Sequence, residues 1–225
     1  RASLQVTVVA AETANPLNID AMRRFGAEVL LKGHDFDAAK AHAAELARAT
    51  GAAFLEDGRE PAIAEGAGTI ALELLRSATR PAALYVPVGN GALISGIAAW
   101  TRAHAPDIRV IGVVPEAAPS MALSWRARKV VTTERADTIA DGLAVRLPVD
   151  VAVEFMLDRV DQMVAVSEAR MLDAMRLLFS HAGVAVEPSG AAGLAAILDA
   201  PRDAAPAATI LCGSNLRPDM LRDLL

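Results

Sequence analysis

A glycine-rich turn between an apolar run and an amphipathic segment is the part of the sequence best suited to chemistry. It reads Val88-Gly89-Asn90-Gly91-Ala92-Leu93-Ile94-Ser95-Gly96. After a strand, such a turn lets backbone N–H groups converge at a helix N-terminus, whose dipole adds partial positive charge, so it can hold a phosphate without a charged side chain. The spacing matches neither the lysine-bearing P-loop nor Gly-x-Gly-x-x-Gly. A tight strand-to-helix turn without a ligand has the same pattern, so both interpretations stay open at this point.

The single cysteine, Cys212, is the second candidate. One cysteine excludes an internal disulfide framework and a cysteine-based zinc cluster. It ends an apolar run, where a buried core cysteine without a chemical role is also common. The histidines stand at helix ends or on polar faces without ligand-like spacing, so we expect no metal site.

The elements that must position these residues alternate between short apolar runs and helix-periodic segments, the pattern of βαβ units. The predicted strands are 6–9, 28–31, 52–55, 83–88, 110–114, 163–166 and 209–212. The predicted helices are 15–26, capped by Asn15; one capped by Asp35 or Asp37 that runs to about residue 50; 63–76; 92–104; 149–160; 168–181, with Ser167 as its cap; and one from Pro218. The predicted fold class is therefore α/β, with mostly parallel, helix-covered sheets, and the best candidate for a domain boundary is the loop 57–61.

Composition excludes several function classes. The 225 residues carry a net charge of −5, and 53% are hydrophobic. Scattered arginines on an acidic chain argue against binding to nucleic acid. Charges, prolines or glycines interrupt every apolar stretch before the roughly 20 residues that span a bilayer. We therefore expect a cytoplasmic protein with no nucleic-acid or membrane partner.

The turn resembles the phosphate loop of fold type II pyridoxal-phosphate enzymes, where Gly-Gly-Gly-Gly-Leu-Ile-Ser-Gly is usual. Two of its four glycines are Asn90 and Ala92 here; both keep the backbone N–H, and asparagine tolerates positive φ. Further motifs resemble the serine/threonine dehydratase group in type and order: residues 23–29, 65–71, 112–116, 138–142, 186–191 and 210–215.

This resemblance implies roles for individual residues. Pyridoxal 5'-phosphate would be the cofactor, and its phosphate would be bound by Gly89, Asn90, Gly91, Ala92 and Leu93. Cys212 would face the pyridine nitrogen, with Ser214 as the alternative if the register differs by two. Glu187 would lie near the cofactor ring or would only cap a turn before Pro188, and Asp141 would fix a loop over the site or serve only as a turn residue. Where some dehydratases and racemases hold a divalent cation, the first carboxylate position is Val114, which also argues against a metal.

The catalytic lysine of the family is expected to be missing from these residues. Lys32, Lys40 and Lys129 are the only lysines, and none stands in the family's Ser-x-Lys context. In the family, that lysine and the Ser-Gly-Asn-His loop come before the region that Arg1 would match. The resemblance thus predicts an N-terminally incomplete enzyme, with 1–60 the remainder of the smaller domain and 61–225 most of the larger, cofactor-binding one.

The predicted function is a pyridoxal-phosphate-dependent ammonia-lyase that converts L-threonine or L-serine to a 2-oxo acid and ammonia, acting on a small amino acid as a homodimer. One alternative is a non-catalytic protein on the same scaffold that binds a phosphate ligand or a partner. Racemase, threonine synthase and cysteine synthase activities are further alternatives within the fold.

Overall fold

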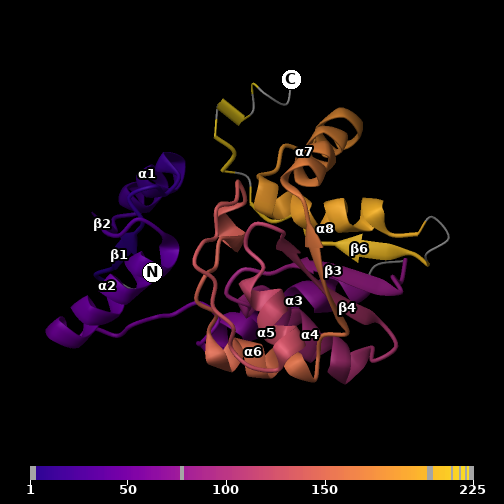
Figure 1. The fold of residues 1–225 in the computed structure, drawn as a ribbon, viewed down its shortest axis with the longest axis horizontal. Coiled ribbons are helices and arrows are strands. Elements are labelled where there is room, and N and C mark those ends of the chain that lie inside the picture. The colour runs from indigo at the N-terminus through magenta and orange to yellow at the C-terminus, as the bar shows by residue number, and fades with distance from the viewer. Residues whose placement is uncertain are drawn as a thin grey trace. The chain divides into compact units, whose positions relative to one another are not determined.

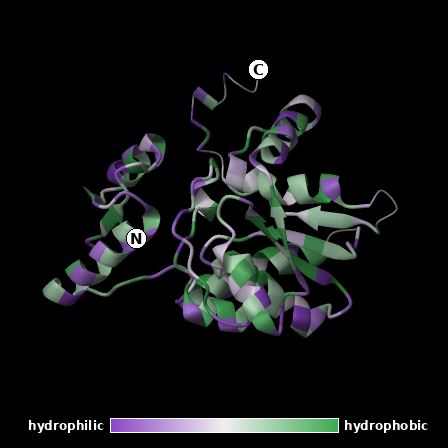
Figure 2. Ribbon diagram, viewed as in Figure 1, coloured by the Kyte–Doolittle hydropathy of each residue, from purple (hydrophilic) through white to green (hydrophobic). Residues whose placement is uncertain are grey.

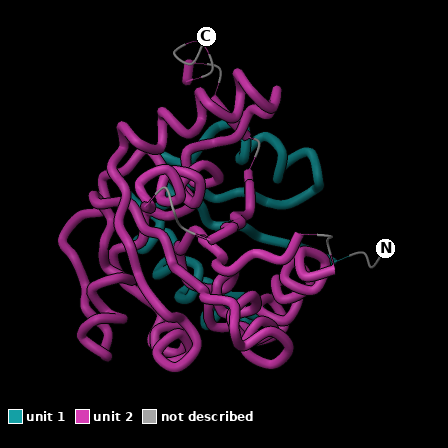
Figure 3. The backbone as a smooth tube through the Cα atoms, turned by 90° about the vertical axis from the view of Figure 1, so that its right-hand side faces the viewer, with its two compact units in different colours: residues 1–56 teal, residues 57–225 magenta. Residues whose placement is uncertain are grey.

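The computed structural model describes residues 4–76, 79–201, 205–213, 215–217, 219–220 and 222. Its contacts divide the chain into two compact units, one up to Glu56 and the other from Asp57 (Figure 3). The boundary predicted from the sequence, the loop 57–61, directly adjoins this division. Among the described helices, none is long and apolar enough to cross a membrane.

The first unit is a pair of parallel strands with two helices. Its elements are β1 (Thr7–Ala10), α1 (Pro16–Arg24), β2 (Glu28–Leu31) and α2 (Phe36–Thr50). Both helices start at side chains that accept a hydrogen bond from the first turn: Asn15 from the Leu17 N–H, 3.0 Å, and Asp35 from the Ala38 N–H, 2.8 Å. The predicted Asn15 cap is confirmed, and of the two candidates for α2 the structure selects Asp35.

The second unit is a four-stranded parallel sheet covered on both faces, in the order β5-β4-β3-β6. Its strands are β3 (Ala83–Pro87), β4 (Arg109–Pro115), β5 (Gln162–Val166) and β6 (Ala207–Thr209). Its helices are α3 (Pro61–Leu75), α4 (Ala92–His104), α5 (Ser120–Ala127), α6 (Asp150–Leu157), α7 (Glu168–Leu177) and α8 (Pro188–Asp199), with a 3₁₀ turn at Asp141–Leu143 and a π turn at Leu178–Ala182. The predicted class, α/β with mostly parallel helix-covered sheets, is confirmed.

The two faces of this sheet pack against different helices, as Figure 1 shows for α8 on one side and α3, α4, α5 and α6 on the other. Alternate residues of β3 separate the two cores: Leu84 and Val86 lie with α4 and α6, whereas Ala83 and Tyr85 lie with α7 and α8. Every residue of β3 is buried, which suits a central strand. Figure 2 shows this apolar character along the strands.

Helix α4 is also fixed by its close approach to α3. A Cβ on Gly96 would overlap the Ala64 carbonyl oxygen, and a Cβ on Gly68 would lie 3.1 Å from the Gly96 carbonyl oxygen. Only glycines allow the two helices to lie this near each other. Because α4 follows the glycine-rich turn directly, this packing sets where the helix N-terminus lies.

Two strand predictions need correction. Residues 52–55 form no strand, because no third described strand pairs with β1 and β2, and Leu55 is 74% exposed. The last strand was expected at 209–212 but is Ala207–Thr209. At the end of β6 the Thr209 hydroxyl donates to the Tyr85 carbonyl oxygen, 2.8 Å away. A side-chain hydroxyl therefore uses this hydrogen-bond acceptor of the neighbouring strand β3.

Helices α5 and α8 were not predicted. Helix α8 reads Pro-Ser-Gly-Ala-Ala-Gly-Leu-Ala-Ala-Ile-Leu-Asp, and most of its residues are buried, so it lacks the polar face that marks a surface helix. The helix predicted from Pro218 begins at a residue outside the described ones.

Candidate functional site

The glycine-rich turn leads from β3 into α4 as the sequence predicted. Val88 extends the strand by donating its N–H to the Val113 carbonyl oxygen, 2.9 Å. Gly91 is the N-cap of α4 with φ +96°, a left-handed conformation that favours glycine. A Cβ there would lie 2.9 Å from Cβ of Ala152, so the backbone passes close to α6. Among the described residues no side chain caps α4, which leaves its first-turn N–H groups available to an anion.

Gly89 is held by a second loop. A Cβ on Gly89 would overlap the carbonyl oxygen of Gly142, and the Gly142 N–H donates to the Ser189 hydroxyl, 3.1 Å. At the other end of this loop, Glu168 accepts hydrogen bonds from the Thr138 hydroxyl and the Ile139 N–H, at 2.7 and 3.0 Å. The first residues of α7 and α8 therefore fix the loop 138–142, and the loop in turn contacts the glycine-rich turn.

Asn90 is the residue of the turn that departs most from the family's pattern, and its side chain is buried, with 3% exposed. Its Nδ2 donates to the Asp57 carbonyl oxygen, 3.2 Å, while its Oδ1 has no hydrogen-bond partner among the described residues. Its φ is not positive, so the tolerance of asparagine for that region is not used here.

These features fit the phosphate of pyridoxal phosphate. The glycines bring the backbone close, and the helix N-terminus lacks a side-chain cap in the described part of the chain. A dianionic group bound by backbone N–H donors needs no lysine or arginine beside it.

Glu187 and Cys212 lie together beside α8. Gly213, with φ +84°, sits against the Glu187 side chain, so a Cβ there would overlap the carboxyl group, and the Glu187 N–H donates to the Gly213 carbonyl oxygen, 3.2 Å. A Cβ on Gly190 would overlap the Cys212 carbonyl oxygen. The turn after β6 and the start of α8 are thus packed backbone to backbone. Ser214 lies outside the described residues.

Burial raises the pKa values of three side chains near the start of α8: Glu187, Asp141 and Cys212. It raises the pKa of the Glu187 carboxyl, and the charge of Asp141 raises it further, against a hydrogen bond from the Asn215 N–H. Burial likewise raises the pKa of Asp141, against the charge of Arg217. The pKa of the Cys212 thiol is raised by burial and then by Glu187. Since an ordinary thiol titrates with a pKa of about 8.5, Cys212 keeps its proton at neutral pH.

Sequence reasoning missed Glu168 and Ser189. Both stand in the first turn of a helix and bond the loop 138–142. Ser189 lies within a motif that carries the family resemblance, but nothing in one sequence indicates that its hydroxyl accepts from Gly142. The Glu168 contact spans 30 residues of chain, and only the fold brings its ends together.

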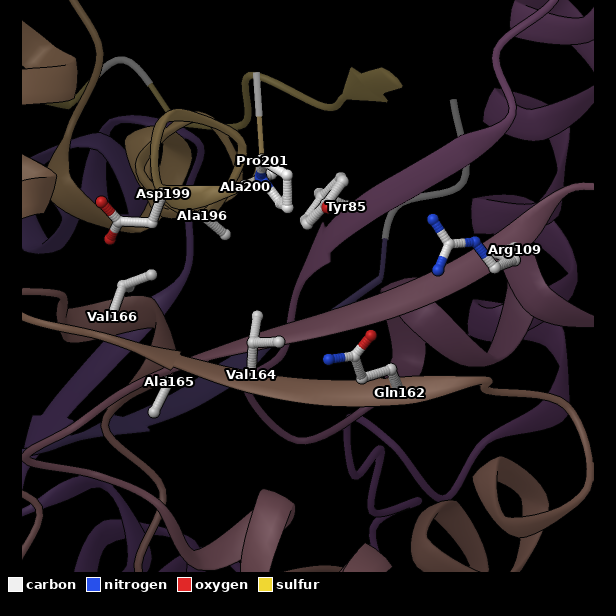
Figure 4. Close-up of a pocket in the computed structure, with 10 residues that line it drawn as sticks. All are labelled: Tyr85, Arg109, Gln162, Val164, Ala165, Val166, Ala196, Asp199, Ala200 and Pro201. Atoms are coloured by element: carbon white, nitrogen blue, oxygen red, sulfur yellow. The ribbon is translucent and has the colours of Figure 1, made fainter. Parts of the chain in front are cut away.

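A cavity of about 520 Å³ lies elsewhere in the second unit, along β5 and beneath the end of α8 (Figure 4). None of its described lining residues belongs to the predicted site. Its Asp199 carboxylate is bonded to the Arg170 guanidinium, 2.7 Å from Nε. Within the described ranges, no three His, Cys, Asp or Glu side chains are grouped to hold a metal ion.

Comparisons with known proteins agree with this geometry. Residues 1–213 match the family model described as "Pyridoxal-phosphate dependent enzyme". The chain is 38% identical over 196 residues to an L-threonine ammonia-lyase of Thermotoga maritima, covering 87% of this chain and 49% of that protein. It is 35% identical over 191 residues to a serine racemase of Arabidopsis thaliana, covering 85% of this chain and 57% of that protein.

A solved structure, the processed form of threonine deaminase isoform 2 from Solanum lycopersicum, superposes with a TM-score of 0.87 at 30% identity. The match covers 98% of this chain and 65% of that one. The chain spans about half the length of the ammonia-lyase relative and less than two thirds of the racemase relative.

Proposed function

The chain belongs to the fold type II pyridoxal-phosphate-dependent enzymes of the serine/threonine dehydratase group, and from this we propose that the protein is an ammonia-lyase that converts L-threonine or L-serine to a 2-oxo acid and ammonia. The observation that carries the proposal is the uncapped α4 N-terminus behind Gly89–Gly91, in a chain 38% identical to an L-threonine ammonia-lyase. The cofactor is pyridoxal phosphate, as the family match indicates.

The backbone N–H groups of Gly89, Asn90, Gly91, Ala92 and Leu93 would hold the phosphate. When bound, the cofactor would supply an electron-withdrawing ring that stabilises the negative charge left at the substrate's α-carbon when its proton is lost. Cys212 would face the ring nitrogen and keep its proton on Sγ, since its pKa is raised. As a neutral group, Cys212 would not protonate the ring nitrogen, and the resemblance implies that such a partner suits elimination at Cβ better than transamination. Glu187, whose pKa is raised by burial, would lie near the cofactor ring.

We propose that the lysine that moves the substrate's α-proton lies outside these 225 residues. The positions of the three lysines support this. Lys40 pairs with Asp37 and Glu56, at 3.2 and 3.5 Å. Lys32 follows β2 and Lys129 follows α5, and both side chains are exposed.

Serine racemisation is the second candidate, because a serine racemase of Arabidopsis is 35% identical to this chain. Elimination and racemisation both begin with loss of the α-proton, so the glycine-rich turn serves either reaction. They diverge afterwards, because elimination breaks a bond at Cβ whereas racemisation returns a proton to the opposite face of the α-carbon. The homodimer stays a prediction from the resemblance and the cytoplasmic location a prediction from the composition, and sedimentation and localisation experiments on the whole protein would test them.

Two experiments test the proposal. For this chain, the ³¹P resonance of pyridoxal phosphate should broaden or shift on titration with protein, and inorganic phosphate should compete. For the whole protein, L-threonine and L-serine should yield 2-oxo acid and ammonia, while formation of D-serine alone would favour the racemase. Phosphate binding without any turnover by the whole protein would leave only a non-catalytic binding function. Absence of both would overturn the proposal.

A further inference from the structure

The Asn90 side chain forms a hydrogen bond with the backbone of the same chain. The residue is only 3% exposed, and its Nδ2 donates to the carbonyl oxygen of Asp57, 3.2 Å away. Asp57 is the first residue of the second unit, directly after the boundary at Glu56. The glycine at this position in the usual pattern could not make such a bond.

Gly58 packs on the same place. It has φ +83°, and a Cβ on it would overlap the carbonyl oxygen of Asn90 and lie 3.0 and 3.2 Å from C and Cβ of Asn90. The turn 57–59 therefore rests on the backbone of the glycine-rich turn, and not only on one side chain. Any residue larger than glycine at 58 must lift the two segments apart.

A second attachment lies at Arg59, whose Nη2 donates to Asp150 Oδ1 at 2.9 Å. The two side chains are 45% and 67% exposed, so this ion pair contributes little stability. Asp150 starts α6, and Ala152 of the same helix is the neighbour of Gly91. The connecting segment thus contacts the glycine-rich turn at Asn90 and α6 at Asp150, and the Asn90 contact is the buried one.

We propose that Asn90 is a positioning residue that fastens the connecting segment Asp57–Arg59 to the phosphate-binding turn, so that binding of a phosphate-bearing ligand and ordering of the segment reinforce each other. The inference rests on the proposed function for its ligand. The physical reason is linkage: a ligand that restricts the backbone at Asn90 also restricts the group to which Asn90 is bonded, and the effect is reciprocal.

Hydrogen exchange of the 225-residue chain, measured at the amides of residues 57–60, tests the inference with pyridoxal phosphate as the probe. In the parent protein, saturating pyridoxal phosphate should slow exchange there by about fivefold or more, the lower end of ordinary coupling between sites. In Asn90→Gly the segment should exchange about fivefold faster without ligand, and pyridoxal phosphate should no longer slow it. Asp150→Asn, which weakens only the exposed pair, is the matched control and should change exchange much less.

Gly58→Ala is an independent second variant. It keeps the Asn90 amide but forces the segment off the turn, so it should also exchange faster at residues 57–60. Amides in α8 report whether each variant stays folded.

The outcomes separate the two proposals. If the parent chain fails to bind pyridoxal phosphate, the binding part of the proposed function fails for this chain, and the ligand-free comparison of Asn90→Gly with the parent still decides the fastening. Equal exchange rates in those two proteins would overturn the inference. So would ligand protection of residues 57–60 in Asn90→Gly as strong as in the parent.

Discussion

Replacement of Gly91 by alanine is the sharpest test of the geometry of the glycine-rich turn. Two costs add at this position. The left-handed φ of +96° costs a residue with a Cβ about 1–2 kcal/mol. The new Cβ would lie 2.9 Å from Cβ of Ala152 and 3.2 Å from Cε of Met121, and relief of such overpacking costs about 1–3 kcal/mol. We therefore expect Gly91→Ala to lower the free energy of unfolding by about 2–5 kcal/mol, the sum of these costs.

The second unit offers a matched control in Gly183, which has φ +64° and no described atom within 4 Å of the position that a methyl group would take. Gly183→Ala bears only the backbone cost, about 1 kcal/mol. Urea unfolding of both variants separates the two terms. The double variant Gly91→Ala/Ala152→Gly removes one close contact, so a double-mutant cycle should show a favourable coupling of about 1 kcal/mol. If Gly91→Ala loses no more stability than Gly183→Ala, the close approach of the turn to α6 is wrong.

Three further predictions concern charged groups. Lys40→Met should lower the free energy of unfolding of the first unit by about 1–3 kcal/mol, because Lys40 lies 3.2 Å from the buried Asp37 carboxylate. Urea unfolding should show that the double variant Lys40→Met/Asp37→Asn regains part of this lost stability. Glu168→Gln should speed hydrogen exchange of the Ile139 backbone N–H by about fivefold, because the glutamine side chain has one acceptor oxygen where the Glu168 carboxylate uses two. An unchanged exchange rate would contradict the anchoring of loop 138–142. Glu187→Gln should gain stability relative to the parent as pH rises from about 4 to 7. The raised pKa of Glu187 means that the folded protein binds the proton more tightly than the unfolded chain, so the parent loses stability as pH rises through that range, and a constant difference in urea unfolding would refute this.

Local signals in the sequence predicted the elements that carry them. The Asn15 and Asp35 caps and the apolar β3 strand are encoded within a few residues, and the structure has them. The apolar run 52–55 failed because a strand exists only when another strand pairs with it, and pairing is not written in the run itself. Helix α8 was missed for the opposite reason: it is buried on nearly all sides, so no polar face produces a helical period.

The site was predictable as far as the glycine-rich turn and the motifs around it. The contacts that support it were not, because they join residues distant in the chain: Glu168 with Thr138, 30 residues apart, and Asn90 with Asp57, 33 apart. A single sequence shows that such polar residues exist, but not which group each of them will hydrogen-bond to in the fold.

The glycines of the turn also show why its sequence alone leaves two interpretations open. Gly91 is required by its left-handed backbone and by α6, and Gly89 by the Gly142 carbonyl, so both would be needed in a packed turn with no ligand. Ala92 and Asn90 have no positive φ, so residues with a Cβ fit the backbone conformation at both positions. The packing of the turn is therefore enough to explain Gly89 and Gly91, with or without a ligand. The feature that points to a phosphate is the N-terminus of α4, which no side chain caps in the described part of the chain. These first-turn N–H groups of α4 can therefore donate to an anion, which the packing of the glycines does not explain.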